Sequence, residues 1–241
     1  MVEWSYVYYN AEPAFVNEGK LPLFTERLRP SWQEFPACAS KLPLSMAAYP
    51  RGHLSGGNLM DERDLKETFL DGQTVFPGII IRVEHWNVRL PNGETAVREV
   101  ACHPGASAVV PLDEAGNLIM VRQHRIAVGR LTLEIPAGKL DSAEEDPLVC
   151  AKRELSEETG FTAARWEKLT CLETTPGFCN ERIHLYLATG LSRGDTHPDE
   201  DEFVATVRLP LKEAVDRVMR GEIRDGKTAL GIMMAAYRLS H

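Results

Sequence analysis

The chain has 241 residues, of which 44% are hydrophobic and 26% charged, which suits one globular domain with a substantial core. Its formal net charge of −8 argues against a general nucleic-acid-binding protein, because neutralising phosphates requires clustered Lys and Arg. No apolar run approaches the roughly 18 residues that span a membrane, and there is no signal-peptide pattern, so we expect a cytoplasmic protein without membrane association. The five cysteines include no CxxC pair, so we expect them to be reduced, with neither a disulfide framework nor a zinc site.

Residues 1–59 differ in composition from the rest of the chain. They contain nine of the eighteen aromatic residues and six of the fifteen prolines, and they end in a Gly- and Ser-rich stretch that is typical of a linker. One interpretation is an arm that covers the substrate or contacts a dimer partner. We favour the other, a poorly ordered extension that precedes a domain over residues 60–241.

The first half of this domain is rich in β-forming residues. Turn signals at 91–93 (Pro-Asn-Gly) and 113–116 (Asp-Glu-Ala-Gly) separate apolar runs. Strands are therefore predicted over 78–90, 95–101, 107–112, 117–123 and 131–135.

The pattern then changes to a helical period. Asp146 is a suitable N-cap with Pro147 at the first helical position, and Gly160 suits the end of the same helix. Further strands are predicted over 166–172, 183–189 and 203–209, and helices over 211–220 and 228–239. This alternation predicts an α/β (α+β) fold in which a mixed β-sheet lies between helices.

Three glutamates in the predicted helix are the most informative feature. Glu154, Glu157 and Glu158 stand at i, i+3 and i+4, so their carboxylates project from one helical face. A bare ExxEE pattern is most often a solvated acidic surface. Like charges near a helix C-terminus are unfavourable unless a cation compensates them, and clustered carboxylates suit Mg²⁺ or Mn²⁺.

The whole stretch from Gly138 to Phe161 resembles the Nudix box, a glycine and a glutamate followed by Arg-Glu-apolar-x-Glu-Glu-x-Gly-apolar. The last nine positions match without a gap. The family usually has five residues between the glycine and the first glutamate and seven more before the arginine. Glu144 satisfies the first spacing and Glu145 the second, so a one-residue insertion leaves open which of them has the family role.

The resemblance implies the Nudix fold and a metal-dependent hydrolase that cleaves a phosphorus anhydride. Glu154 and Glu158 would be the principal metal ligands. Glu157 would either bridge two ions or contact the ligands of an ion without binding it directly, and Arg153 would orient the carboxylates. The main-chain carbonyl of Ala137 would be a further ligand. The expected ion is Mg²⁺, with Mn²⁺ as a substitute.

Pro176, sixteen residues after Gly160, is similar to a signature of the ADP-ribose pyrophosphatase subgroup. A Pro-Gly pair alone is equally consistent with a simple turn, but flanking segments resemble the same subgroup. They single out Arg98 and Arg125 as candidate phosphate or ribose contacts and Glu134 as a candidate substrate- or Arg-binding group. Two strand aromatics are candidates to stack on adenine, although such residues are more often core: Phe76 and Trp86.

Hydrolysis also needs a group that positions or deprotonates the attacking water. In the subgroup this glutamate comes from a loop after the box. The acidic run at 199–202 fits that place, with Glu202 as first choice and Glu200 as second; a solvated acidic loop is the alternative.

The expected reaction is hydrolysis of ADP-ribose to AMP and ribose 5-phosphate. Another nucleoside-diphosphate sugar such as GDP-mannose, or a dinucleotide, is the alternative substrate. A non-catalytic ADP-ribose sensor is the alternative class, disfavoured because a binder need not keep repulsive carboxylates. RNA decapping is disfavoured by the net charge. The resemblance also implies a homodimer, which the residues themselves do not show.

Overall fold

The structure is a computed structural model that describes residues 64–142, 144–194 and 203–241. The extension predicted over 1–59 and the candidate residues Glu200 and Glu202 lie outside the described residues. Within the described part of the chain, no helix has the length and apolar character needed to cross a membrane.

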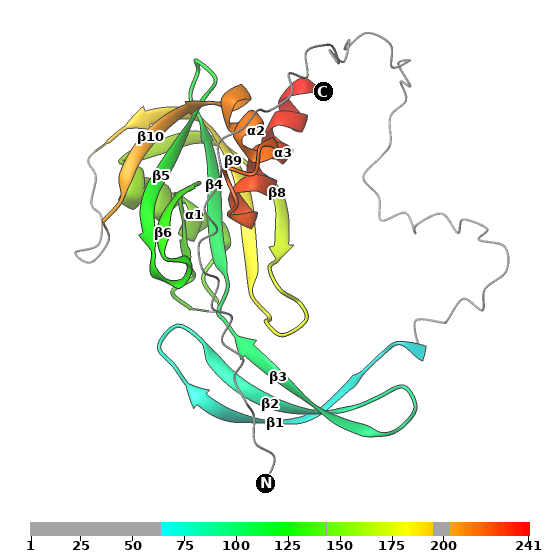
Figure 1. The fold of residues 1–241 in the computed structure, drawn as a ribbon. Helices are drawn as coiled ribbons and strands as arrows, with labels where there is room; N and C mark the ends of the chain where they lie inside the picture. The colour runs from blue at the N-terminus through cyan, green and yellow to red at the C-terminus, as the bar shows by residue number, and fades with distance from the viewer. Residues whose placement is uncertain (1–63, 143, 195–202) are drawn as a thin grey trace, which may run out of the picture. The chain divides into compact units, whose positions relative to one another are not determined.

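A mixed sheet forms the centre of the described structure (Figure 1). The strand order is β10-β5-β4-β9-β8, with β6 paired to β5 and β7 paired to β4. Strands β4 and β9 run parallel, whereas the other pairs are antiparallel. The bounds are β4 Ala106–Leu112, β5 Asn117–Arg125, β6 Arg130–Glu134, β7 Ala137–Lys139, β8 Phe161–Glu173, β9 Arg182–Arg193 and β10 Ala205–Pro210.

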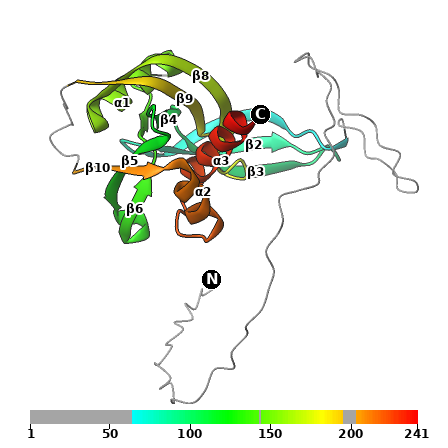
Figure 2. The ribbon, with the colours of Figure 1, turned by 90° about the horizontal axis from the view of Figure 1, so that it is seen from above.

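Helices cover both faces of this sheet, as predicted (Figures 1 and 2). Helix α1 (Pro147–Thr159) packs on one face, where Ala151 and Leu155 join a buried cluster with Val109 of β4. Helices α2 (Leu211–Met219) and α3 (Gly226–Ser240) pack on the other face. Every residue of β4 is buried, because successive side chains enter the two cores in turn.

A second, antiparallel sheet consists of β1 (Thr68–Pro77), β2 (Arg82–Arg89) and β3 (Thr95–Cys102). Strand β1 was not predicted, and the strand predicted from residue 78 begins at Arg82. All of β1 is exposed and it contains Asp71 and Gly72, so its sequence lacks the alternation of a half-buried strand. Pairing with β2 is what makes this segment a strand, and the loop 78–81 joins the two.

The predicted positions of the other strands are confirmed, but several ends differ. Strands β8 and β9 extend well beyond 166–172 and 183–189 because they pair with each other along almost their whole length. The short strand β7 was not predicted; it exists because Ala137 to Lys139 pair with the start of β4.

Local signals position helix α1 as the sequence predicts. The Asp146 side chain accepts a hydrogen bond from the amide of Leu148 at 2.8 Å, and Pro147 opens the helix. At the other end Gly160 has φ +70° and donates its N–H to the Ser156 carbonyl at 2.8 Å. The helix that carries the three glutamates is therefore fixed at both ends.

Candidate functional site

The centre of the site is the contact between α1 and β7. A Cβ atom placed on Gly138 would lie 2.0 Å from Oε1 of Glu154, closer than real Cβ atoms approach any atom. Glycine is therefore required here so that the Glu154 carboxylate can lie against the main chain of β7. Beside it, the amide of Ala137 donates a hydrogen bond to Oε2 of Glu158 at 3.0 Å.

Arg153 organises the carboxylates of this helix. Its Nη1 donates to Glu154 at 2.7 Å and to Glu157 at 3.2 Å, and its Nη2 donates to the Lys139 carbonyl at 3.3 Å. Burial opposes the charge of Arg153, but Glu154 and the neighbouring acidic groups outweigh it and raise its pKa. Arg153 thus stays charged and ties α1 to β7.

The protonation of Cys150 is also set by this neighbourhood. Burial, reinforced by the charge of Glu154, raises the pKa of the Cys150 thiol to about 11, so it remains protonated. Its sulfur lies 3.6 Å from the Lys139 carbonyl and 3.7 Å from the Gly138 carbonyl.

The three glutamates provide hard oxygen donors of the kind that divalent cations prefer. Glu154 and Glu158 are buried and lie against Gly138 and Ala137, whereas Glu157 is partly buried and contacts Arg153. Among the described residues, however, no three His, Cys, Asp or Glu side chains are gathered tightly enough to form a metal site by themselves. The donor types fit a divalent ion, but Glu154 and Glu157 both lie against Arg153, so main-chain oxygens, water or substrate would have to complete the coordination.

The structure distinguishes Glu144 from Glu145. Glu145 Oε1 lies 3.6 Å from Nη2 of Arg153, and its Oε2 accepts a hydrogen bond from the Asp141 amide at 2.7 Å. Glu144 is exposed, and its main-chain amide donates to the Ser142 hydroxyl at 3.2 Å. Only Glu145 therefore points its carboxylate toward the arginine of the helix.

A pocket of about 540 Å³ adjoins this contact, and we call it the β7 pocket. Its lining includes three cationic residues from three elements and two acidic ones: Arg125, Lys139, Lys227, Glu181 and Asp225. The main chain of Ala137 and Gly138 forms part of the same wall. Arg125, a predicted phosphate or ribose contact, thus lines the same pocket as Ala137, the predicted main-chain metal ligand.

Glu134 lies next to this pocket and binds its cations. Arg125 donates to both of its oxygens, from Nε at 2.9 Å and from Nη2 at 2.8 Å, and Lys227 Nζ lies 2.5 Å from Oε2. Burial would raise the pKa of Glu134, but hydrogen bonds from Arg125 and the charge of Lys227 outweigh it and lower the pKa to about 2. The prediction that Glu134 meets an arginine agrees with this geometry.

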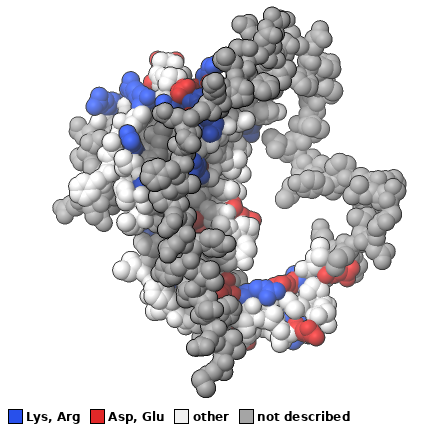
Figure 3. Space-filling view, viewed as in Figure 1, with Lys and Arg blue, Asp and Glu red and all other residues white. Residues whose placement is uncertain are grey.

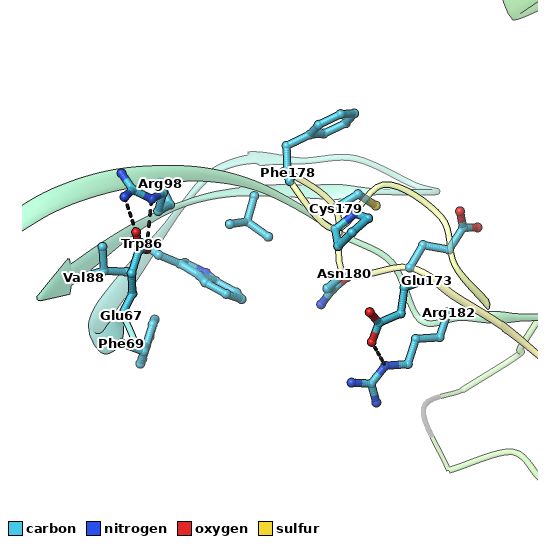
Figure 4. A pocket seen from close by; sticks show the side chains of 14 residues that line it. Glu67, Phe69, Trp86, Val88, Arg98, Glu173, Phe178, Cys179, Asn180 and Arg182 are labelled. Carbon is cyan, nitrogen blue, oxygen red and sulfur yellow. Dashed lines mark hydrogen bonds and ion pairs between the residues drawn. The ribbon is translucent and has the colours of Figure 1, made fainter. Parts of the chain in front are cut away.

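A second pocket, of about 470 Å³, opens between the three-stranded sheet and the loop after β8, and we call it the aromatic pocket (Figure 4). Its lining includes Trp86 and Phe69 toward one end and Glu173 with Arg182 toward the other. Pro176 and Phe178 also line it. Glu181 lines both this pocket and the β7 pocket, so the two are neighbours.

Arg98 lines the aromatic pocket but is paired with Glu67, to which it donates from both Nε and Nη2. Phe76 does not line this pocket; it lies with residues 77–81 around a separate hollow. The indole of Trp86 packs edge-on against Phe69 at 5.3 Å between ring centroids. Of the two aromatics suggested for stacking, only Trp86 is near the site.

Sequence reasoning missed three residues that the fold brings to these pockets: Phe69, Phe178 and Lys227. Lys227 stands two residues after the N-cap Asp225 of α3, where a lone lysine gives no signal. Phe178 lies in the Pro176-Gly177 turn, and only the turn could have drawn attention to it. The separation of 93 residues between Glu134 and Lys227 explains why no local pattern connects them.

Comparisons with known proteins agree with this geometry. The family profile described as NUDIX domain matches residues 102–229, more than half of the chain. The ADP-ribose pyrophosphatase of Bacillus subtilis (strain 168) is 42% identical over 172 residues, which cover 70% of this chain and 92% of that protein. The methanol dehydrogenase activator of Bacillus methanolicus is 40% identical over 178 residues, with 73% and 93% covered.

A solved structure described as an ADP compounds hydrolase shares the fold. It superposes with a TM-score of 0.64 over 73% of this chain and 95% of that chain, at 24% sequence identity. Hydrolases of this kind generally use divalent metal ions. The profile match, the high identity to relatives over most of their length and the carboxylate-bearing helix against β7 place this chain in the Nudix hydrolase family.

Proposed function

We propose that this Nudix hydrolase cleaves the pyrophosphate bond of ADP-ribose, adding one water to give AMP and ribose 5-phosphate. The observation that carries the proposal is the adjacency of two unlike pockets on either side of Glu181. The aromatic pocket suits a nucleobase, and the β7 pocket, lined by cations and by the main chain of β7, suits a phosphorylated sugar. A relative named ADP-ribose pyrophosphatase at 42% identity supports the same substrate.

Glu154 and Glu158, with the carbonyl of Ala137, would hold Mg²⁺, and Mn²⁺ could replace it. Glu157 would either bridge two ions or contact the groups that bind the ion. When bound, the ion would neutralise pyrophosphate charge and lower the pKa of the attacking water. Arg153 keeps Glu154 and Glu157 in place through its hydrogen bonds of 2.7 and 3.2 Å. The contact between Arg153 and Glu145 favours Glu145 as the glutamate of the box.

Substrate binding is assigned to side chains on the two pocket walls. Arg125, held in place by Glu134, would bind the phosphorylated part in the β7 pocket, and Arg98 would contact phosphate or ribose at the aromatic pocket. Trp86 is the residue proposed to stack on adenine. Trp86→Ala should therefore raise KM more than it lowers kcat.

Glu202 is proposed to position or deprotonate the water, with Glu200 as second choice. Both belong to the acidic segment before β10, the strand that pairs with β5. Glu202→Gln should lower kcat while KM changes little, because water activation matters in the transition state rather than in binding.

A substrate panel with Mg²⁺ tests the proposed reaction directly. We expect a kcat/KM for ADP-ribose at least about tenfold above those for GDP-mannose and diadenosine polyphosphates, a difference of about 1.4 kcal/mol in transition-state binding. Products are separated by chromatography, and AMP with ribose 5-phosphate should appear in equal amounts. Faster turnover of GDP-mannose would refute the ADP-ribose assignment, and tight binding without turnover would favour a sensor.

We also infer that the protein forms a homodimer through the three-stranded sheet. Large apolar side chains at one end of this sheet are exposed: Val75, Phe76, Ile79, Ile80 and Ile81. The visible part of the sheet shows charged side chains of both signs among uncharged ones (Figure 3). Exposed apolar patches of this kind are typical of protein–protein contacts, and a second copy of the chain is the proposed partner.

A further inference from the structure

We propose that Lys227 binds the phosphate of the sugar-phosphate half of the substrate, beside Arg125, and that Glu134 holds both cations in position. The inference rests on the proposed function and adds to it a phosphate-binding residue at the start of α3. Glu134 is a positioning residue in this arrangement, because it acts through Arg125 and Lys227.

The hydrogen bonds of Lys227 leave it able to bind a ligand. Its Nζ donates to Glu134 Oε2 at 2.5 Å and to Asp225 Oδ2 at 3.0 Å. An ammonium group has three N–H donors, so within the described residues one of them has no acceptor. The side chain is 11% exposed and lines the β7 pocket, so this donor is within reach of a bound molecule.

The buried Glu134 carboxylate has partners other than Lys227. Arg125 already pairs with both of its oxygens, and the Thr132 hydroxyl donates to Oε1 at 2.7 Å. Removing a lysine from water is costly, and one bidentate arginine satisfies a carboxylate well. Pairing with Glu134 alone therefore does not account for a lysine at this buried position, whereas binding of an anionic ligand does.

The charges around the β7 pocket fit an anionic ligand. Arg125 comes from β5, Lys139 from β7 and Lys227 from α3, against Asp225 and Glu181. Among the described lining residues these three cations outnumber the two carboxylates, and the third nearby carboxylate, Glu134, pairs with Arg125 and Lys227 from next to the pocket. Phosphate is the group that such converging charged donors bind best.

The place of the β7 pocket between the α1 contact and the aromatic pocket indicates which half of the substrate it would bind. The β7 pocket includes Ala137 and Gly138, on which the carboxylates of α1 rest, so a phosphate in it is next to the hydrolytic centre. The aromatic pocket holding Trp86 and Phe178 is the place for the base. The phosphate at Lys227 therefore belongs to the part remote from the base.

The test compares the full-length protein with Lys227→Met, which keeps the length of the side chain but removes its charge, and with Lys227→Arg, which restores the charge. Lys227→Gln is a second neutral variant in case Lys227→Met does not fold. Lys212→Met is the matched control, because Lys212 is exposed on α2 and pairs only with Asp216 among the described residues. Melting temperature is measured for every variant.

Two measurements carry the result. In steady-state kinetics with ADP-ribose and Mg²⁺, the neutral variants should raise KM about tenfold with kcat within about twofold, a loss of about 1.4 kcal/mol of binding. Calorimetric titration should show ribose 5-phosphate binding weakened to a similar extent, with AMP binding unchanged. Lys227→Arg should recover most of the loss, and Lys212→Met should behave as wild type.

A lower melting temperature with unchanged KM and unchanged ribose 5-phosphate affinity would overturn the inference, since Lys227 would then serve only the fold. Weaker AMP binding instead would overturn the assignment to the sugar-phosphate half. If the wild-type protein does not cleave ADP-ribose, the proposed function fails, whereas the ribose 5-phosphate titration still decides whether Lys227 binds this phosphate.

Discussion

Among individual residues, Glu134 shows how the fold controls the charge of one side chain. It is 2% exposed, yet it accepts hydrogen bonds from Arg125, Thr132 and Lys227. A carboxylate removed from water is stable in its charged form only when such donors surround it. The pKa of Glu134 is therefore about 2 instead of the ordinary 4.5.

This lowered pKa predicts a pH dependence of folding stability. A carboxylate whose folded pKa lies below its unfolded value stabilises the fold fully above the unfolded pKa, near 4.5, and loses that contribution as pH falls toward about 2. The shift corresponds to about 3 kcal/mol of unfolding free energy.

Urea unfolding of wild type and Glu134→Gln at pH 7, 5, 4 and 3 measures the effect, and other carboxylates cancel in the comparison. The difference between the two proteins should be constant from pH 7 to 5 and shrink below pH 5. A difference that persists unchanged to pH 3 would contradict the assignment.

Glu158 gives the sharpest test of the metal site. Glu158→Gln keeps an oxygen that can accept the hydrogen bond from the Ala137 amide but removes the negative charge. We expect kcat to fall at least about 100-fold, or about 2.7 kcal/mol, with little change in melting temperature. Mn²⁺ titration followed by electron paramagnetic resonance should show weaker binding.

Glu144→Gln is the control, because its exposed side chain has no contact with Arg153 among the described ion pairs. Near-normal kcat of Glu158→Gln at saturating Mg²⁺ would refute the ligand role.

At the scale of elements, the site depends on how closely α1 approaches β7. Three observations define the contact: the Glu154 carboxylate against Gly138, the Ala137 amide on Glu158, and Arg153 on the Lys139 carbonyl. The helix is fixed by its own caps, whereas β7 is fixed by pairing with β4. Both elements must keep their places for the Glu154 and Glu158 carboxylates to lie against β7.

Gly138→Ala tests this closeness. The new Cβ would overlap the Glu154 carboxylate, so either that side chain or the whole helix must move. Overpacking of this kind costs about 1–3 kcal/mol, and we expect a lower melting temperature together with a fall in kcat. Gly177→Ala is a matched control for stability, because nothing lies within 4 Å of its added Cβ. An unchanged melting temperature and kcat in Gly138→Ala would show that the contact is looser than the structure indicates.

At the scale of the whole molecule, the three-stranded sheet is the part at which we propose the dimer contact. Strand β1 is exposed along its whole length, and Ile79 in the following loop is fully exposed. A sheet that packs so little apolar surface internally gains stability by burying it against another chain. A second copy offers the same surface in a two-fold arrangement.

Ile80→Glu should therefore shift the protein from dimer to monomer, because a dimer contact would have to bury two new carboxylates without partners. Light scattering coupled to size-exclusion chromatography measures the mass at several concentrations. Glu144→Gln again serves as a control, since it lies outside this sheet. A wild-type protein that is monomeric at high micromolar concentration would refute the dimer.

The sequence by itself determined the features that depend on local geometry. The i, i+3, i+4 spacing places Glu154, Glu157 and Glu158 on one side of any helix, and the caps at Asp146 and Gly160 define that helix from short-range hydrogen bonds. The order of strands and helices followed in the same way from turn residues and periodicity. These features depend only on residues a few positions apart, so they can be predicted from the sequence without the tertiary structure.

Only the tertiary structure decided the features that join distant segments. Strand β1 exists through its partner β2, and the approach of Glu145 to within 3.6 Å of Arg153, which supports our proposal of Glu145 as the glutamate of the box, depends on the folded loop before α1. Lys227 and Glu134 meet across 93 residues. Such contacts form because the free energy of burying the core offsets the entropy lost on closing long loops. This balance depends on the whole chain, so no short stretch of sequence predicts it.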